Sequence, residues 1–238
     1  MKSFIYATTL LVLLLMASIV YSAKSNYRDL VDNTIERSQM IQEQRVNNIV
    51  STMNRVQTTL DNSPLKISQK IVMYENVLYS LAKEVKMYES GGVVLLGSKL
   101  EYLVDELPHF VYSGDLSKLN FKDIVSDPQR YGSLPGNNLR ECYRQMSIGL
   151  ERGSCINTWT ADKEYLYWHR IPNLGIQANG KHYYFLLGFK NNEALKDVYK
   201  YNVNRVITIA VQAIFVIFSS FVAIWAMKQR YADRTRPV

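Results

Sequence analysis

Histidine is scarce in this chain, and recognisable catalytic motifs are absent. The three histidines, His109, His169 and His182, stand too far apart in sequence to form a local metal site. The chain has no glycine-rich phosphate loop, no Gly-x-Ser-x-Gly and no His-Glu-x-x-His. We therefore expect a protein that is not an enzyme and that uses no metal and no cofactor.

Cysteine is almost as rare. The two cysteines, Cys142 and Cys155, belong to no Cys-x-x-Cys motif. If this part of the chain is exported, a disulfide between them is favoured over two free thiols. The bridge would close a loop of about 13 residues, which the chain-entropy model values at up to about 3 kcal/mol. An Asn-x-Ser/Thr acceptor is also absent, so the sequence has no mark of a eukaryotic glycoprotein.

Positive charge is in excess, but it is unevenly distributed. The formal net charge is +7, yet residues 23–204 carry 22 Lys+Arg against 20 Asp+Glu, which leaves only +2 there. The other +5 comes from Lys2, Arg205 and the tail after Met227, beside two apolar segments. The positive-inside rule and anionic headgroups account for such a placement. We therefore expect a membrane and no nucleic acid as the partner.

Two long apolar runs frame the chain. The second, Val206–Met227, has 22 residues without a charge, and roughly 20 are needed to span a bilayer as a helix. The first, Phe4–Tyr21, has 18 such residues and is either a retained anchor or a signal peptide cut before Ala23. Because signal-peptide cores are usually about 7–15 residues long, its length favours the anchor.

These runs predict four parts. They are an N-terminal membrane anchor or uncleaved signal (1–22), an extracytoplasmic domain (23–204), a transmembrane helix (205–227) and a short basic cytoplasmic tail (228–238). With the basic tail on the cytoplasmic side, both termini lie in the cytoplasm and the central domain lies in the periplasm. The expected location is the inner (plasma) membrane of a bacterium, with the chain encoded by the bacterium or its phage.

The first half of the central domain has helical periodicity. Helix is expected over 26–60, where apolar residues recur every three or four positions, although Gln42 and Arg45 interrupt the series. The apolar positions are Val46, Ile49, Met53, Val56 and Leu60. This face would pair with a second copy or pack on its own domain.

The next segments predict a second helix and then a change of period. Asn62-Ser63-Pro64 ends the first helix and starts another, which runs to Gly91-Gly92, with Ser63 as its cap. Val93–Leu107 predicts a third helix, although Val93–Leu96 alone also suits a strand. His109–Tyr112 predicts a short strand.

The remainder of the domain predicts one helix and several strands. The helix covers 138–150 and ends at Gly153, and a further helix over 192–204 leads into the second apolar run. The strands are expected at Cys155–Thr160, Tyr165–Ile171, Gly175–Ala178 and Lys181–Lys190, with a hairpin turn at Asn179-Gly180.

Aromatic residues gather late in the domain and mark the candidate ligand site. On a strand, Tyr165, Tyr167 and His169 share one face and Arg170 lies on the other. Aromatic rings with a few polar groups suit a pocket for a small polar or charged ligand, although such rings also favour the core of a sheet. The candidate ligand-binding residues are Trp159, Tyr165, Tyr167, His169, Arg170 and Tyr184.

The order of elements resembles the bacterial extracytoplasmic sensor domains of the Cache (PAS-like) type. The resemblance is carried by Tyr165–Leu195, which has a strand, a proline, a glycine-centred turn, an apolar strand and a short helix towards the membrane. It implies an α+β, PAS/Cache-like domain with a long N-terminal helix between two transmembrane helices. Only a short tail follows the second run, so a sensor of this form would pass its signal to a second copy or to another membrane protein.

A second resemblance lies in Asn179–Tyr184 (NGKHYY), which is similar to the periplasmic part of T4-type phage holins. On the first resemblance, the sequence predicts a periplasmic sensing or regulatory subunit that binds a small molecule or a protein partner. The alternatives are a holin-like lysis or superinfection-exclusion protein, and a structural subunit of an envelope complex.

Overall fold

The computed structural model describes residues 2–89, 91–105, 120–131, 138–159, 162–171, 174 and 182–234. The chain forms two compact units, one of residues 1–33 with 196–238 and the other of residues 34–195. The second unit combines helices with an antiparallel sheet, as the α+β prediction requires. It is somewhat shorter than the predicted domain of residues 23–204.

The longest helix is α1 (Lys2–Asp61). In the second unit Val46, Ile49, Met53 and Leu60 of α1 are buried in a cluster with residues of the sheet. This face of α1 therefore packs on its own domain, which was one of the two expected uses of the series. Gln42 does not interrupt the buried face as predicted, because its side chain is only 2% exposed.

Helix α2 (Ile67–Glu84) is shorter than expected at both ends. Ser63 does not cap it, because the Ser63 hydroxyl donates to the Leu60 carbonyl at the end of α1 (2.7 Å). At the other end Tyr88 takes a positive φ of 61°, which a continuing right-handed helix does not allow. The buried side chains of α2 are Tyr74, Leu78 and Ala82.

A five-stranded antiparallel sheet forms the centre of the unit, in the order β2-β1-β5-β4-β3. The predicted strands over residues 155–160, 165–171 and 181–190 are confirmed within the described residues, with somewhat different ends. The strands are β1 (Val93–Leu96), β2 (Tyr102–Asp105), β3 (Arg152–Trp159), β4 (Asp162–Ile171) and β5 (Tyr183–Lys190).

The predicted helix over 93–107 is wrong. Its described residues include β1 and β2 instead, and β1 lies between β2 and β5 with all four side chains buried. A strand buried on both faces has a continuous apolar run instead of an alternating one. Periodicity cannot distinguish such a run from a buried helix, and the strand alternative for Val93–Leu96 was the right one.

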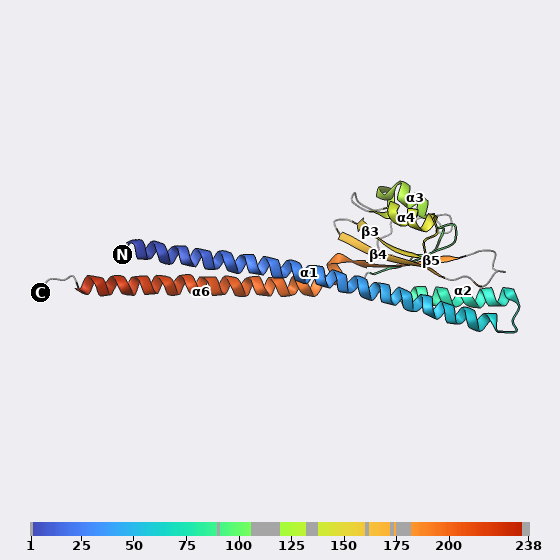
Figure 1. Ribbon diagram of the computed structural model, residues 1–238, viewed down its shortest axis with the longest axis horizontal. Helices are drawn as coiled ribbons and strands as arrows, with labels where there is room; N and C mark the ends of the chain where they lie inside the picture. Colours follow the sequence, from blue (N-terminus) through green and yellow to red (C-terminus); the bar gives the residue numbers. More distant parts are fainter. Residues whose placement is uncertain are drawn as a thin grey trace. The chain divides into compact units, whose positions relative to one another are not determined.

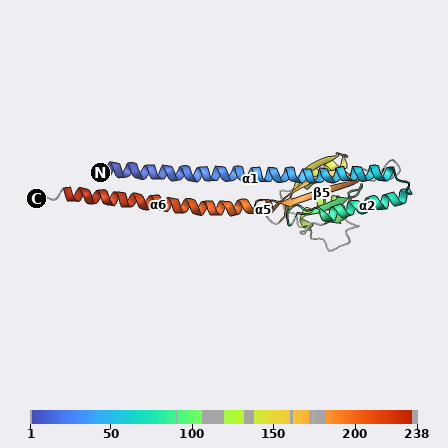
Figure 2. The same cartoon turned by 90° about the horizontal axis from the view of Figure 1, so that it is seen from below.

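Helices cover both faces of this sheet (Figures 1 and 2). The part of α1 that belongs to this unit lies with α2 on one face, and α3 (Phe121–Ser126) and α4 (Leu139–Ser147) lie on the other. A short 3-10 helix, η2 (Pro128–Tyr131), follows α3. The helix predicted over 138–150 is confirmed, but it ends before Gly149, whose φ of 78° suits glycine, and not at Gly153.

The second unit ends after α5 (Asn191–Ala194), and α6 (Lys196–Arg234) belongs to the first unit. Among the described residues one helix, Lys196–Arg230, is long and apolar enough to cross a membrane. The N-terminal run is helical within α1, but its role as a second span stays a prediction. The expected strands at His109–Tyr112 and Gly175–Ala178 and the turn at Asn179-Gly180 lie outside the described residues.

Candidate functional site

Strand β4 presents its side chains alternately to the two faces of the sheet. Tyr165 and Tyr167 pack against the cluster shared with α1 and α2, whereas Leu166 and Trp168 are buried in the cluster shared with α3 and α4. The predicted alternation is confirmed for these four residues. The two tyrosines therefore face the long helix.

A groove of about 290 Å³ lies beside these two tyrosines, and we call it the α1–β3 groove. Strand β3 is at the edge of the sheet, with β4 as its neighbour, and α1 forms the other wall. The groove is lined by Gln39, Gln42 and Glu43 of α1, by Asn138 before α4, by Ser154, Cys155 and Ile156 of β3, and by Tyr165, Leu166 and Tyr167 of β4.

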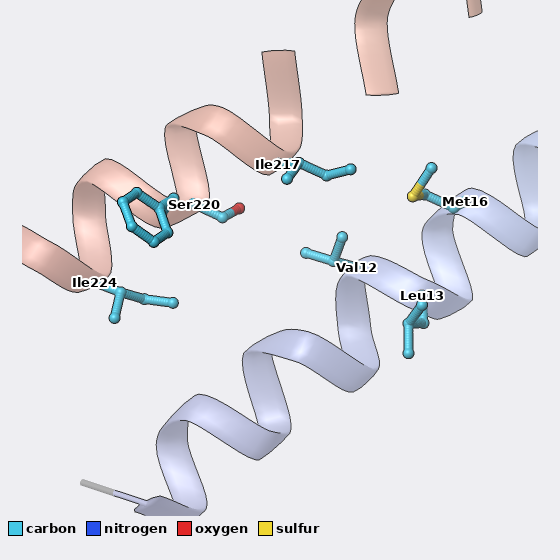
Figure 3. A pocket seen from close by; sticks show the side chains of 7 residues that line it. Val12, Leu13, Met16, Ile217, Ser220 and Ile224 are labelled. Atoms are coloured by element: carbon cyan, nitrogen blue, oxygen red, sulfur yellow. The ribbon is translucent and has the colours of Figure 1, made fainter. Parts of the chain in front are cut away.

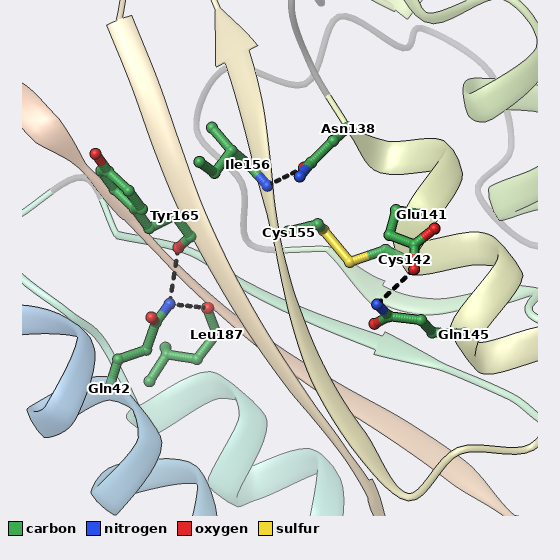
Figure 4. The surroundings of a disulfide bond; sticks show 9 residues. All are labelled: Gln42, Asn138, Glu141, Cys142, Gln145, Cys155, Ile156, Tyr165 and Leu187. Atoms are coloured by element: carbon green, nitrogen blue, oxygen red, sulfur yellow. Dashed lines mark hydrogen bonds between the residues drawn. A yellow bond between two sulfur atoms is a disulfide. The ribbon is translucent and has the colours of Figure 1, made fainter.

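Gln42 fixes the α1 wall to the sheet. Its side-chain nitrogen donates to the Tyr165 carbonyl of β4 (2.7 Å) and to the Leu187 carbonyl of β5 (Figure 4). Both strands are thus tied to one helical residue that is almost fully buried. Because buried amides need partners, this pair of hydrogen bonds accounts for a polar residue inside the helix face.

Glu43 occupies the same wall one residue further along α1. It accepts a hydrogen bond from the Tyr167 hydroxyl (3.2 Å) and lies 3.6 Å from the Arg152 guanidinium of β3. Burial raises the pKa of Tyr167 above its usual value, the Glu43 carboxylate raises it further, and Arg152 opposes these effects. Tyr167 therefore stays neutral and serves as a hydrogen-bond donor at neutral pH.

The edge strand is held at the groove by α4. The Asn138 backbone N–H donates to the Ile156 carbonyl (2.9 Å), and the Asn138 side-chain oxygen accepts from the Ile156 N–H. One residue before Ile156, Cys155 forms the disulfide with Cys142 of α4, with 5.7 Å between their Cα atoms (Figure 4). The predicted bridge is therefore present, and it fastens β3 to α4 directly behind the groove.

Three of the other predicted ligand-binding residues, His169, Arg170 and Tyr184, do not line the groove. Tyr184 is buried in the cluster with α3 and α4, where its hydroxyl donates to the Met146 carbonyl (2.9 Å). The half-buried His169 places Nδ1 2.8 Å from the Arg170 carbonyl, and the Arg170 side chain is half-buried as well. Trp159 ends β3, and its side chain lies outside the described residues. The structure thus brings two of the six predicted residues, Tyr165 and Tyr167, to one groove.

Five polar groove residues were not predicted as site residues: Gln39, Gln42, Glu43, Asn138 and Ser154. Gln39 and Glu43 lie more than 110 positions from β4 in the chain, and only the packing of α1 on the sheet brings them there. A sequence signal for them existed in part, because Gln42 was one of the two polar residues that interrupted the apolar series of α1. That break marks the point at which the helix meets polar groups of the sheet.

A second groove, of about 290 Å³, lies inside the other unit (Figure 3). Val12, Leu13 and Met16 of α1 face Ile217, Ser220, Phe221 and Ile224 of α6 across it. Its one hydroxyl, that of Ser220, donates to the Val216 carbonyl of its own helix (2.8 Å). This lining is apolar, so it suits hydrocarbon and not a polar ligand.

Compared with known proteins, the chain matches no family model, and it has no significant match among curated proteins or solved structures.

Proposed function

We propose that the protein is a membrane-anchored sensing or regulatory subunit whose α+β domain binds a small molecule in the α1–β3 groove. The observation that carries this proposal is the position of α1. The helix supplies one wall of the groove and continues without a break into the N-terminal apolar run. A ligand that shifts Gln39 or Glu43 therefore acts on the helix that leads to the membrane.

The layout of the domain supports a PAS/Cache-like sensor. A long helix leads from the first apolar run into a domain with a central antiparallel sheet, and the last strand passes through α5 into the apolar α6. This is the order of elements on which the resemblance rests. The domain is proposed to lie in the periplasm, with both termini in the cytoplasm, because the basic tail follows the second run.

A sensing subunit also needs a partner in the membrane, either a second copy or another protein. Thr208, Gln212 and Ser219 are exposed on α6 and lie at helical spacings that place them on one face. Polar side chains of this kind bond neighbouring helices within a bilayer. They support a helix–helix contact through α6.

A ligand screen on the full-length protein in lipid nanodiscs tests the proposal. Thermal unfolding is followed by tryptophan fluorescence with amino acids, amines, organic acids, sugars and nucleotides. A ligand at about 100 times its Kd adds about 2.7 kcal/mol to the free energy of unfolding, so a hit is a clear rise in Tm. We expect one of these classes of compound to give such a rise in Tm. Tyr167→Phe should bind that ligand about ten-fold more weakly, because Glu43 loses the hydrogen bond from the Tyr167 hydroxyl.

The matched control is Tyr201→Phe, which changes an exposed tyrosine of α6 that does not line the groove. It should leave the affinity unchanged. A hit that Tyr167→Phe does not weaken would place the ligand elsewhere. No rise with any class would contradict small-molecule sensing and turn attention to protein partners.

A further inference from the structure

The charges at the α1–β3 groove cancel. Of the described residues that line it, Glu43 alone carries a formal charge at neutral pH. The Arg152 guanidinium lies 3.6 Å from its carboxylate, and Tyr167 donates to the same oxygen. The described lining therefore offers no unpaired counter-charge to an ionic ligand. The pair itself is exposed, with side-chain exposures of 61% for Arg152 and 45% for Glu43, so it adds little stability of its own.

Neutral polar groups remain available on both walls. Gln39 of α1 and Ser154 of β3 are exposed, and among the described residues their side chains make no hydrogen bond. Gln39 offers an amide donor and acceptor, and Ser154 offers a hydroxyl. They lie on opposite sides of the groove, so a ligand between them meets hydrogen-bonding groups on two sides.

The groove also has an apolar and aromatic part. Ile156 and Tyr165 line it, and the Tyr165 ring stacks on Phe189 with centroids 5.2 Å apart and planes 19° apart. Stacking holds the ring in one orientation. The volume of about 290 Å³ is at the small end of the range of roughly 300–1,000 Å³ for ligand sites, which suits a molecule of about one sugar ring.

We infer that the ligand is a small neutral molecule rich in hydroxyl groups, such as a sugar. Its hydroxyls bond Gln39 and Ser154, and its carbon skeleton lies on Ile156 and Tyr165. This inference rests on the proposed function, because it names the ligand class of the same groove. It predicts that carboxylate and ammonium compounds of the same size bind more weakly.

The test compares sugars with their charged counterparts on the full-length protein in nanodiscs. The panel holds neutral hexoses, pentoses and disaccharides, each hexose accompanied by its uronic acid and its amino sugar. We expect a neutral member to raise Tm, and its acid and amine counterparts to bind at least about ten-fold more weakly.

Two variants and a control locate the binding. Gln39→Leu and Ser154→Ala each remove a free polar group, so each should weaken the neutral ligand about ten-fold. Gln44→Leu changes an exposed amide of α1 that does not line the groove, and it should have no effect. Both groove residues are exposed, so neither variant should unfold the domain.

The outcomes separate the inference from the proposed function. A charged ligand whose binding is lost in Gln39→Leu would overturn the inference and leave a sensing groove in place. A neutral ligand unaffected by both variants would overturn the inference as well, because it would bind elsewhere. If no member of this panel binds, the inference fails, and the proposed function is then decided by the wider screen of amino acids, amines, organic acids and nucleotides.

Discussion

Gln42 holds α1 to the sheet through the only buried amide of that helix among the described residues. Its two acceptors, the carbonyls of Tyr165 and Leu187, belong to neighbouring strands. The hydrogen bond to Leu187 is buried and the one to Tyr165 is partly buried, so water replaces them only in part when they are lost. Gln42 also lines the α1–β3 groove, so the residue that fastens α1 to the sheet is part of the groove wall.

Replacing Gln42 with leucine should therefore destabilise the domain despite the greater hydrophobicity of leucine. We expect the free energy of unfolding to fall by about 1–3 kcal/mol, because one buried and one partly buried carbonyl lose a donor. Denaturant unfolding followed by tryptophan fluorescence measures it, with Gln44→Leu as the control at an exposed site, where changes stay within about 0.5 kcal/mol. An equal or higher stability for Gln42→Leu would show that the amide does not hold the helix.

The sequence predicted the positions of single side chains correctly where a local rule applied. The alternation of a strand placed Tyr165 and Tyr167 on one face and Trp168 on the other, and the structure confirms it. It misread Gln42 as an interruption, since a polar residue in an apolar series has no local sign of its distant partners. It also grouped Tyr184 with the ligand site, although that hydroxyl is used inside the core.

At the scale of elements, β3 is one of the two edge strands of the sheet. It is an edge strand paired with β4 alone, and the Cys142–Cys155 bridge ties it to α4. Both cysteines are buried, with exposed fractions of 0% and 3%. The bridge therefore holds one wall of the groove in place and is protected from reductants while the domain is folded.

Replacing both cysteines with alanine should lower the free energy of unfolding by about 2–4 kcal/mol, through the greater freedom of the unfolded chain. Denaturant unfolding of the full-length protein measures the change. The control is thiol alkylation of the unreduced, denatured wild type, which should find no free thiol. Two alkylated thiols there, or an unchanged stability in the double variant, would contradict the structural role of the bridge.

The elements themselves were predictable to different degrees. The helix α1 and the strands β3, β4 and β5 are long and regular, and their patterns are distinct. The strands β1 and β2 are four residues each, and β1 is buried on both faces, so its sequence looks like a core helix. The groove was out of reach because α1 and β3 meet only in the folded domain.

At the scale of the whole molecule, one described helix can cross a membrane, and positive charge gathers after its end. The domain formed by residues 34–195 has nearly balanced charge and an internal disulfide. Both properties agree with a domain outside the cytoplasm and a tail within it. The proposed sensing function depends on this arrangement, since the groove must face the compartment from which the ligand comes.

Alkaline phosphatase fusions in a bacterial host test this arrangement most directly, because the enzyme is active only after export. One fusion follows Leu195, where the domain ends, and the other follows Val238, beyond α6. We expect activity from the first fusion and none from the second. Activity from both would show that α6 does not cross the membrane, and activity from the second alone would place the domain in the cytoplasm and contradict the proposed sensor.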